Sequence, residues 1–176
     1  MSHHYSKQGI TNVMISYHWD SQPLAVKVRD YLRSNGVRVT MNEGEVKGDP
    51  FQWMVDSVKA SDAIILVLTP KYEQSKNCER EAKFAHDLGK KMIPLVGERN
   101  YTGGDGWLAT LIAGKLWYDI VNDFDTSMSN ILRRELDILI PKRVQPPRKV
   151  KQLPLDEPES PKLNHVQVQI SSRGSC

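Results

Sequence analysis

The sequence predicts an α/β fold of the flavodoxin-like type, in which a five-stranded parallel sheet of strand order 2-1-3-4-5 carries helices on both faces. Short apolar runs alternate with amphipathic segments five times in about 140 residues, and right-handed crossovers turn such an alternation into one parallel sheet. The run from Ala63 to Leu68 contains only Ala, Ile, Leu and Val. Such a run is typical of a central strand that is covered on both faces.

The first half of the chain is expected to form two further strands and two helices. Asn12 to Tyr17 is a short apolar run with β-branched residues, and residues 37–41 alternate between apolar and polar side chains. Both patterns are typical of strands. Asp20 or Ser21 is expected to cap the helix between them, and Asp49 the next helix. The positions expected to face the core are Leu24, Val28, Tyr31 and Leu32 in the first helix and Phe51, Met54, Val55 and Val58 in the second.

The second half is expected to add a fourth and a fifth strand. Residues 92–96 form an apolar run, but Pro94 cannot donate a hydrogen bond to a neighbouring strand, which predicts an irregular or peripheral strand. A short helix at 107–113 and a strand at 115–120 follow, and a last helix begins at 125–126. The positions of this last helix that are expected inside are Met128, Ile131, Leu132, Leu136 and Leu139.

The helix expected from Ser75 to Leu88 contains an acidic residue on its apolar side. At 100° per residue, Glu81 falls inside the apolar stripe. A carboxylate aimed at the sheet must be paired, capped, protonated or used in function. Glu81 is therefore either a functional residue or a structural one that binds first-turn amides or the backbone of a neighbouring strand. The apolar stripe consists of Cys78, Ala82, Ala85 and Leu88, with Phe84 at its margin.

Length and composition predict one folded domain with a polar extension. The chain has 176 residues, of which 39% are hydrophobic and 26% are charged. Six of the ten prolines lie between Pro141 and Pro161, beside basic and acidic runs. Such a segment cannot bury a core. We therefore expect a flexible N-terminus at 1–10, a domain at 11–140 and a disordered tail at 141–176.

Charge and cysteine content exclude several classes of protein. The formal net charge is +3, but the chain from Pro141 onward holds seven Lys or Arg against three Asp or Glu. The domain is thus nearly neutral, and no nucleic-acid partner is expected. No run approaches the ~18 apolar residues of a transmembrane segment, and the N-terminus lacks the apolar core of a secretory signal. With only two cysteines, a reducing, cytoplasmic location is expected.

Several common site motifs are missing from the sequence. There is no GxxxxGK[ST] or GxGxxG loop for a nucleotide and no GxSxG elbow for a serine hydrolase. His3 and His4 lack partners at metal-site spacing, so no metal is expected.

The segments that follow the strands are expected to meet at one edge of the sheet, because sites in parallel α/β folds gather beyond the carboxyl ends of the strands. Asn42 to Pro50 has two glycines and four charged residues, which predicts a mobile exposed loop. Glu81 is expected to begin its helix at the same edge. The other segments at this edge are residues 18–20, 43–49 and 69–72 and the chain from Gly97 onward.

Four segments of the chain, in the same order, resemble Toll/interleukin-1 receptor (TIR) domains. VMISYHWD, residues 13–20, is similar to the family's first-strand box. Residues 42–50 stand where the family has its BB loop, and SKNCEREAKFA, residues 75–85, is similar to the third-helix segment. LWYDI, residues 116–120, matches the fifth strand. The resemblance covers roughly residues 11–140.

The resemblance implies a cytosolic protein of innate immune or stress signalling that assembles with itself and with other TIR proteins. The BB loop is the family's main surface for this assembly, so partner contacts are expected there; the alternative is a solvated loop. The residues of this partner-binding loop are Glu43, Gly44, Glu45, Val46, Lys47, Gly48, Asp49 and Pro50.

The resemblance also implies an alternative function, because one branch of the family cleaves the nicotinamide–ribose bond of NAD+ with a glutamate in the third helix. Glu81 occupies that position and is the candidate catalytic residue. Enzymatic members often carry a tryptophan four residues earlier, where this chain has Asn77. NAD+ would be a substrate, and no cofactor is expected. The expected substrate pocket contains Ser16, Tyr17, His18, Trp19 and Tyr72; alternatively, residues 17–19 only pack beneath the BB loop.

Overall fold

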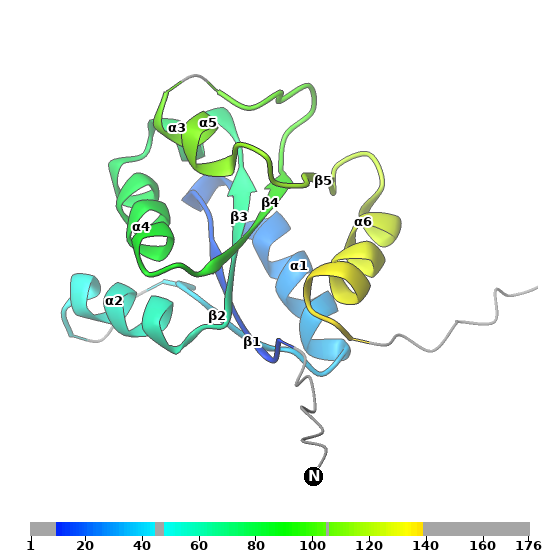
Figure 1. Cartoon of the computed structure of the whole chain (residues 1–176), viewed down its shortest axis with the longest axis horizontal. Coiled ribbons are helices and arrows are strands. Elements are labelled where there is room, and N and C mark those ends of the chain that lie inside the picture. Colours follow the sequence, from blue (N-terminus) through cyan, green and yellow to red (C-terminus); the bar gives the residue numbers. More distant parts are fainter. Residues whose placement is uncertain (1–9, 45–47, 105, 139–176) are drawn as a thin grey trace, which may run out of the picture. The chain divides into compact units, whose positions relative to one another are not determined.

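A parallel sheet of five strands lies at the centre of the computed structural model (Figure 1). Its strand order is β2-β1-β3-β4-β5, and every neighbouring pair is parallel. The predicted fold class is therefore confirmed. The strands are β1 (Asn12–Ser16), β2 (Arg38–Met41), β3 (Ala63–Leu68), β4 (Lys91–Val96) and β5 (Tyr118–Asp119).

The structure describes residues 10–44, 48–104 and 106–138. The predictions for residues 1–9 and for the tail at 141–176 lie outside these ranges. Ile10, the last residue of the N-terminus that was expected to be flexible, is attached to the domain, because its amide donates to the carbonyl oxygen of Leu136 at 2.9 Å. None of the helices in the described ranges combines the length and the hydropathy that a membrane span requires.

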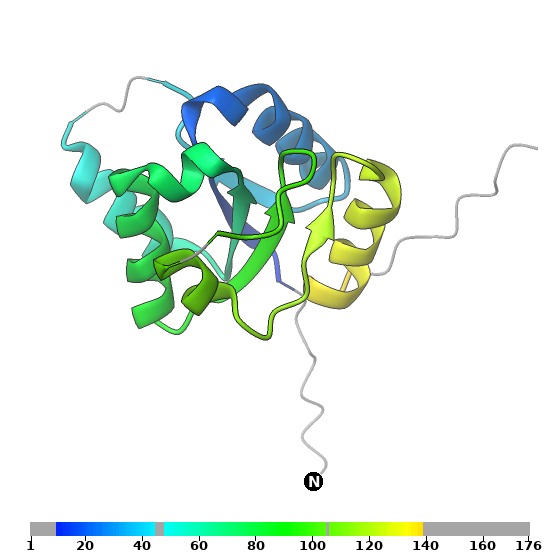
Figure 2. The same cartoon turned by 90° about the horizontal axis from the view of Figure 1, so that it is seen from above.

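Helices cover both faces of the sheet (Figures 1 and 2). One face carries α1 (Gln22–Ser34) and α6 (Phe124–Asn130), which continues into the π-helix η2 (Ile131–Glu135). The other face carries α2 (Pro50–Ala60), α4 (Lys76–Asp87) and α5 (Trp107–Ile112). The short 3-10 helix η1 (Trp19–Ser21) follows β1, and α3 (Pro70–Gln74) follows β3.

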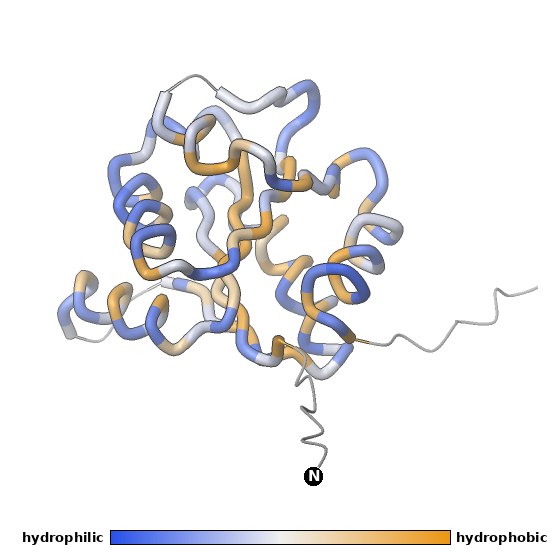
Figure 3. The backbone as a smooth tube through the Cα atoms, in the orientation of Figure 1, coloured by the Kyte–Doolittle hydropathy of each residue, from blue (hydrophilic) through white to orange (hydrophobic). Residues whose placement is uncertain are grey.

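The central strand β3 is buried along its whole length. It pairs with β1 on one side and β4 on the other. Its side chains alternate between the faces, so that Ile65 and Val67 enter the core with α1 and α6, while Ile64 and Leu66 enter the core with α2 and α4. The central strands are accordingly hydrophobic, and the outward turns of the helices are hydrophilic (Figure 3).

The expectation that Pro94 makes β4 irregular or peripheral is wrong. β4 lies between β3 and β5 and pairs with β3 through all six of its residues. On its other side it pairs with β5 only at Leu95 and Val96, beyond the proline. Because β5 is so short, the N–H that Pro94 lacks is not needed there. The strand expected at 115–120 is correspondingly reduced to Tyr118–Asp119.

Two side chains that were expected in the core are exposed instead. Phe51 is 62% exposed and Leu88 is 43% exposed. Phe51 lies in the first turn of α2, and Leu88 is the residue that ends α4. Both lie at helix ends that the other described elements leave uncovered. The remaining expected positions in the described residues are buried or partly buried, and Leu139 lies outside the described ranges.

Helix caps differ from the expectation at two places. The last helix begins at Phe124 rather than at 125–126, because the side chain of Asp123 accepts a hydrogen bond from the amide of Thr126 at 3.1 Å. Ser21 precedes α1, but its side chain makes no capping bond. Asp20 pairs with Lys71 of α3 instead.

Gly97 ends β4 at a point where a side chain has no room. A Cβ atom there would lie 2.8 Å from Cγ1 of Val67 and 3.2 Å from the carbonyl oxygen of Leu68. We expect Gly97→Ala to lower the free energy of unfolding by about 1–3 kcal/mol, because a stiff valine and a strand backbone must move. Urea unfolding measures the change. Glu98→Ala at the exposed next position should change it by less than about 0.5 kcal/mol, and equal effects would contradict the expectation.

Candidate functional site

A cleft of about 520 Å³ opens at the carboxyl end of β1. Its walls come from β1 and the residues after it, from Asn42 after β2, from the start of α2 and from the first turns of α4. Of the residues expected in a substrate pocket, Tyr17, His18 and Trp19 line this cleft together with Glu81. The residues after the first strand and Glu81 therefore lie at one place, as expected from the sequence.

Glu81 points toward the sheet, as its position in the apolar stripe predicts. Its Oε2 accepts a hydrogen bond of 2.7 Å from the Oγ of Ser16, the last residue of β1. Among the described residues, no backbone amide donates to this carboxylate, so the structural alternative considered from the sequence is not found. Burial raises the pKa of Glu81 above its ordinary value, and the Ser16 bond lowers it by less. The carboxylate is therefore held by one side-chain hydroxyl in a largely dry setting.

Ser16 and Tyr72 do not line the cleft, which corrects the assignment of both residues to the pocket. Tyr72 is fully buried behind Ser16, with its hydroxyl 2.8 Å from the Ser16 Oγ. Ser16, which is also buried, has a single hydroxyl hydrogen and donates it to Glu81, so Tyr72 must donate to Ser16. Ser16 and Tyr72 thus form a chain of donors that ends at the carboxylate of Glu81.

The short helix α3, which the sequence did not predict, places Tyr72 in this chain. Thr69 caps α3 by accepting from the Tyr72 amide at 3.1 Å. Glu73, which also belongs to α3, fixes the helix from another direction. Its carboxylate accepts a hydrogen bond from the Tyr101 hydroxyl at 3.3 Å, and its carbonyl oxygen accepts one from the Trp107 ring nitrogen at 3.0 Å. Thr69-Pro70 was the available signal, because a capping residue followed by proline is typical of a helix start.

Aromatic side chains form much of the cleft wall. Tyr17 and Trp19 meet edge to face, with ring centroids 6.0 Å apart. Trp19 is 51% exposed, and Phe51 and Trp53 contribute from α2. His18 caps η1 through its Nδ1, which accepts from the amide of Asp20 at 3.3 Å. The cleft therefore offers aromatic side chains beside one partly buried carboxylate.

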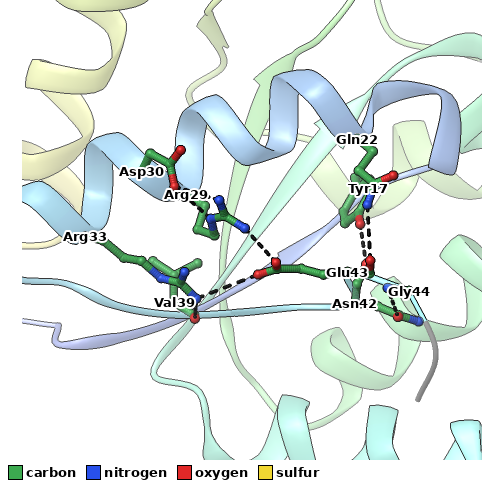
Figure 4. A network of polar contacts seen from close by, with 9 residues as sticks. All are labelled: Tyr17, Gln22, Arg29, Asp30, Arg33, Val39, Asn42, Glu43 and Gly44. Atoms are coloured by element: carbon green, nitrogen blue, oxygen red, sulfur yellow. Dashed lines mark hydrogen bonds and ion pairs between the residues drawn. The ribbon is translucent and has the colours of Figure 1, made fainter.

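The start of the loop after β2 is attached to α1 (Figure 4). The Tyr17 hydroxyl donates to the carbonyl oxygen of Asn42. The carboxylate of Glu43 pairs with Arg29 at 2.7 Å and with Arg33 at 3.8 Å, while its carbonyl oxygen accepts from Gln22 at 3.3 Å. Glu43 is thus fixed by contacts with α1, while its side chain remains 47% exposed.

The other residues of the expected partner-binding loop fall into three groups. Gly44 and Gly48 are exposed and have positive φ angles of 152° and 97°, which favour glycine. Asp49 caps α2 by accepting from the Phe51 amide at 2.9 Å, and Pro50 is the first residue of that helix. The loop residues outside the described ranges are Glu45, Val46 and Lys47.

The first turns of α4 also contribute to the cleft, which was not predicted from the sequence. Asn77, Cys78 and Arg80 line it beside Glu81, and spacings of three and four residues from Glu81 were a usable signal for the first two. The Cys78 thiol donates to the carbonyl oxygen of Tyr17 at 3.7 Å. Burial raises the pKa of Cys78 to about 11. In the described ranges, no group of three or more His, Cys, Asp or Glu side chains is placed to hold a metal ion.

Comparison with known proteins identifies the family. The family model for the TIR domain matches residues 13–134, which is more than half of the chain. The chain belongs to the TIR domain family. The resemblance seen in the sequence is therefore confirmed, and the cleft lies inside this TIR domain. No curated protein matches the sequence.

One solved structure supports the fold of this TIR domain. The TIR domain of the Toll-related receptor TRR-2 from Hydra magnipapillata is similar at a TM-score of 0.56 and 17% identity, over 71% of this chain and 97% of that chain. A TIR-domain structure of the activated Roq1 resistosome, which directly recognises the pathogen effector XopQ, gives a TM-score of 0.44 and 14% identity, over 48% of this chain and 56% of that chain. With a TM-score of 0.44 the second likeness carries no argument, and the first, at 17% identity, concerns the fold alone.

Glu81→Gln is expected to stabilise the TIR domain increasingly as the pH rises from about 4 to about 7. Burial raises the pKa of Glu81 in the folded state, so the folded protein keeps a proton that the unfolded chain has already lost. The unmutated protein therefore loses stability as the pH rises through the folded pKa, whereas glutamine has no such dependence. Urea midpoints of both proteins across this range measure the difference.

The control for this measurement is Glu79→Gln on the same helix. Lys83 and Lys76 lower the pKa of Glu79, so this carboxylate contributes stability that is present above the unfolded pKa and lost in acid. Its replacement should cost stability at neutral pH, opposite in sign to Glu81→Gln. If the urea midpoints of Glu81→Gln and the unmutated protein differed by the same amount at every pH, the expectation would be contradicted.

Proposed function

We propose that this TIR protein hydrolyses the bond between nicotinamide and ribose in NAD+, with Glu81 as the catalytic residue. One observation supports this over assembly alone: the Glu81 carboxylate is partly buried and fixed by Ser16, yet it lines an open cleft. A structural carboxylate needs no access to a cavity. The cleft volume of about 520 Å³ also falls in the range of small-molecule sites.

The chemistry of this bond suits a fixed carboxylate. When the C1′–N bond breaks, nicotinamide leaves with the electron pair and becomes neutral, and positive charge develops on the ribose. The Glu81 carboxylate would stabilise that charge or accept a hydrogen bond from the 2′-hydroxyl, as carboxylates do in glycoside cleavage. Water then adds to C1′ and loses a proton, which gives ADP-ribose, nicotinamide and H+.

The other cleft walls fit an aromatic ligand. Tyr17, Trp19 and Phe51 present ring surfaces to the cleft, and aromatic rings of a ligand pack well on such surfaces. The donors Tyr72 and Ser16 fix the direction of the carboxylate without blocking its second oxygen, since only Oε2 accepts from Ser16. That second oxygen is the one that a substrate would meet.

Glu81→Gln should reduce nicotinamide release from NAD+ by at least about a hundredfold, because the developing positive charge loses its counter-charge. Purified protein at high concentration is incubated with NAD+, and nicotinamide is measured by chromatography. Glu79→Gln is the matched control, because Glu79 is paired with Lys76 and Lys83 outside the cleft. Equal activity of the Glu81→Gln variant and the unmutated protein, or no activity in either, would overturn the proposal.

Assembly between TIR domains is the second candidate function. Phe51 and Trp19 are large apolar side chains that remain 62% and 51% exposed, and both lie at the cleft beside Pro50. Exposed apolar side chains that gather in this way mark surfaces of protein contact. Assembly at this surface and cleavage in the cleft do not exclude each other.

Phe51→Asp is expected to weaken self-association by about tenfold, because it places a charge in an apolar contact. Leu116→Asp serves as the control. Leu116 is 53% exposed but precedes β5, at the sheet edge opposite to β2. Sedimentation equilibrium over a concentration series measures both variants. Equal weakening by the two substitutions, or none by Phe51→Asp, would count against this surface.

A further inference from the structure

We propose that Arg80 and Asn77 form an anion-binding subsite of the cleft that holds the pyrophosphate of a dinucleotide. This inference deepens the proposed function and rests on it for the identity of the ligand. It assigns a role to a wall of the cleft that neither NAD+ cleavage by Glu81 nor assembly requires.

The two side chains are placed next to each other by the helix. Asn77 and Arg80 are three residues apart on α4, so they are neighbours on its surface, and both line the cleft. Both are exposed, whereas Glu81 is partly buried and bonded to Ser16 beneath them. The cleft therefore has an inner acidic group at Glu81, while its outer part carries the Arg80 guanidinium on α4 and the exposed Asp49 carboxylate just before α2.

Arg80 has no structural task in the described part of the chain. The neighbouring carboxylate of Glu79 is already paired with Lys76 at 2.9 Å and Lys83 at 2.7 Å. Asp49, on the opposite wall, accepts from the Phe51 amide. Within the described ranges Arg80 makes no ion pair and no side-chain hydrogen bond, and it is the one Lys or Arg that lines the cleft.

The chemistry of a dinucleotide matches this arrangement. NAD+ carries a positive nicotinamide ring and a doubly negative pyrophosphate, so Glu81 and Arg80 each meet an opposite charge on the ligand. A guanidinium fork binds phosphate through two parallel hydrogen bonds, and the amide of Asn77 adds neutral donors beside it. The amide stands where enzymatic members of the family often have a tryptophan, so this chain offers a hydrogen-bonding group in place of a ring.

Binding of ADP-ribose tests the subsite without requiring catalysis, because ADP-ribose has the pyrophosphate but no bond to cleave. Calorimetric titration of the whole chain with ADP-ribose should show a dissociation constant about tenfold higher for Arg80→Gln and about threefold higher for Asn77→Ala. Arg80→Lys should fall between Arg80→Gln and the unmutated protein, because it keeps the charge but loses the fork. Lys83→Gln, which removes one charge from the same helix outside the cleft, should bind like the unmutated protein.

Three results would overturn the subsite: no ADP-ribose binding to the unmutated protein at millimolar concentration, unchanged affinity in Arg80→Gln, or an equal loss in Lys83→Gln. Thermal unfolding of each variant checks that the fold is intact. The NAD+ cleavage assay is read separately. Arg80-dependent binding of ADP-ribose without cleavage of NAD+ would support the subsite and refute the proposed hydrolysis. Glu81-dependent cleavage of NAD+ with an unchanged ADP-ribose affinity in Arg80→Gln would support the hydrolysis and refute the subsite.

Discussion

The hydrogen bond from Ser16 to Glu81 is the contact on which the site depends. It joins the last residue of β1 to α4, two elements that are far apart in the sequence. A carboxylate is costly to remove from water unless a donor compensates it, and Ser16 is that donor. Ser16 is in turn satisfied by Tyr72, which α3 carries. The cleft can therefore keep an acidic group at its inner end without giving up the packing of the central sheet.

Much of the fold was predictable because its signals are local and periodic. The charge-free run of β3, the alternation in β2 and the stripes of α1 and α4 each follow from burial on known faces. The period gives the direction of a side chain but not whether another element covers it, which is why Phe51 and Leu88 were assigned to the core. Pro94 misled for a related reason, since its effect depends on how far β5 extends along β4.

The site was predictable only in part. The inward direction of Glu81 follows from its helical angle. The closeness of residues 17–19 to Glu81 in the cleft follows from the rule that sites gather beyond the carboxyl ends of parallel strands. The partner of Glu81 could not be predicted, because the register between β1 and α4 is set by the packing of many side chains. The ion pairs of Glu43 with Arg29 and Arg33 could not be predicted either, since Glu43 follows β2 whereas the two arginines belong to α1.

The buried thiol of Cys78 has a consequence for how the cleft responds to its chemical surroundings. Oxidants and alkylating reagents react with thiolates rather than with protonated thiols. Because burial raises the pKa of Cys78 to about 11, thiolate is scarce near neutral pH. The cysteine beside Glu81 therefore behaves as a small apolar side chain, and peroxide concentrations that convert an ordinary exposed cysteine to sulfenic acid would leave this lining intact.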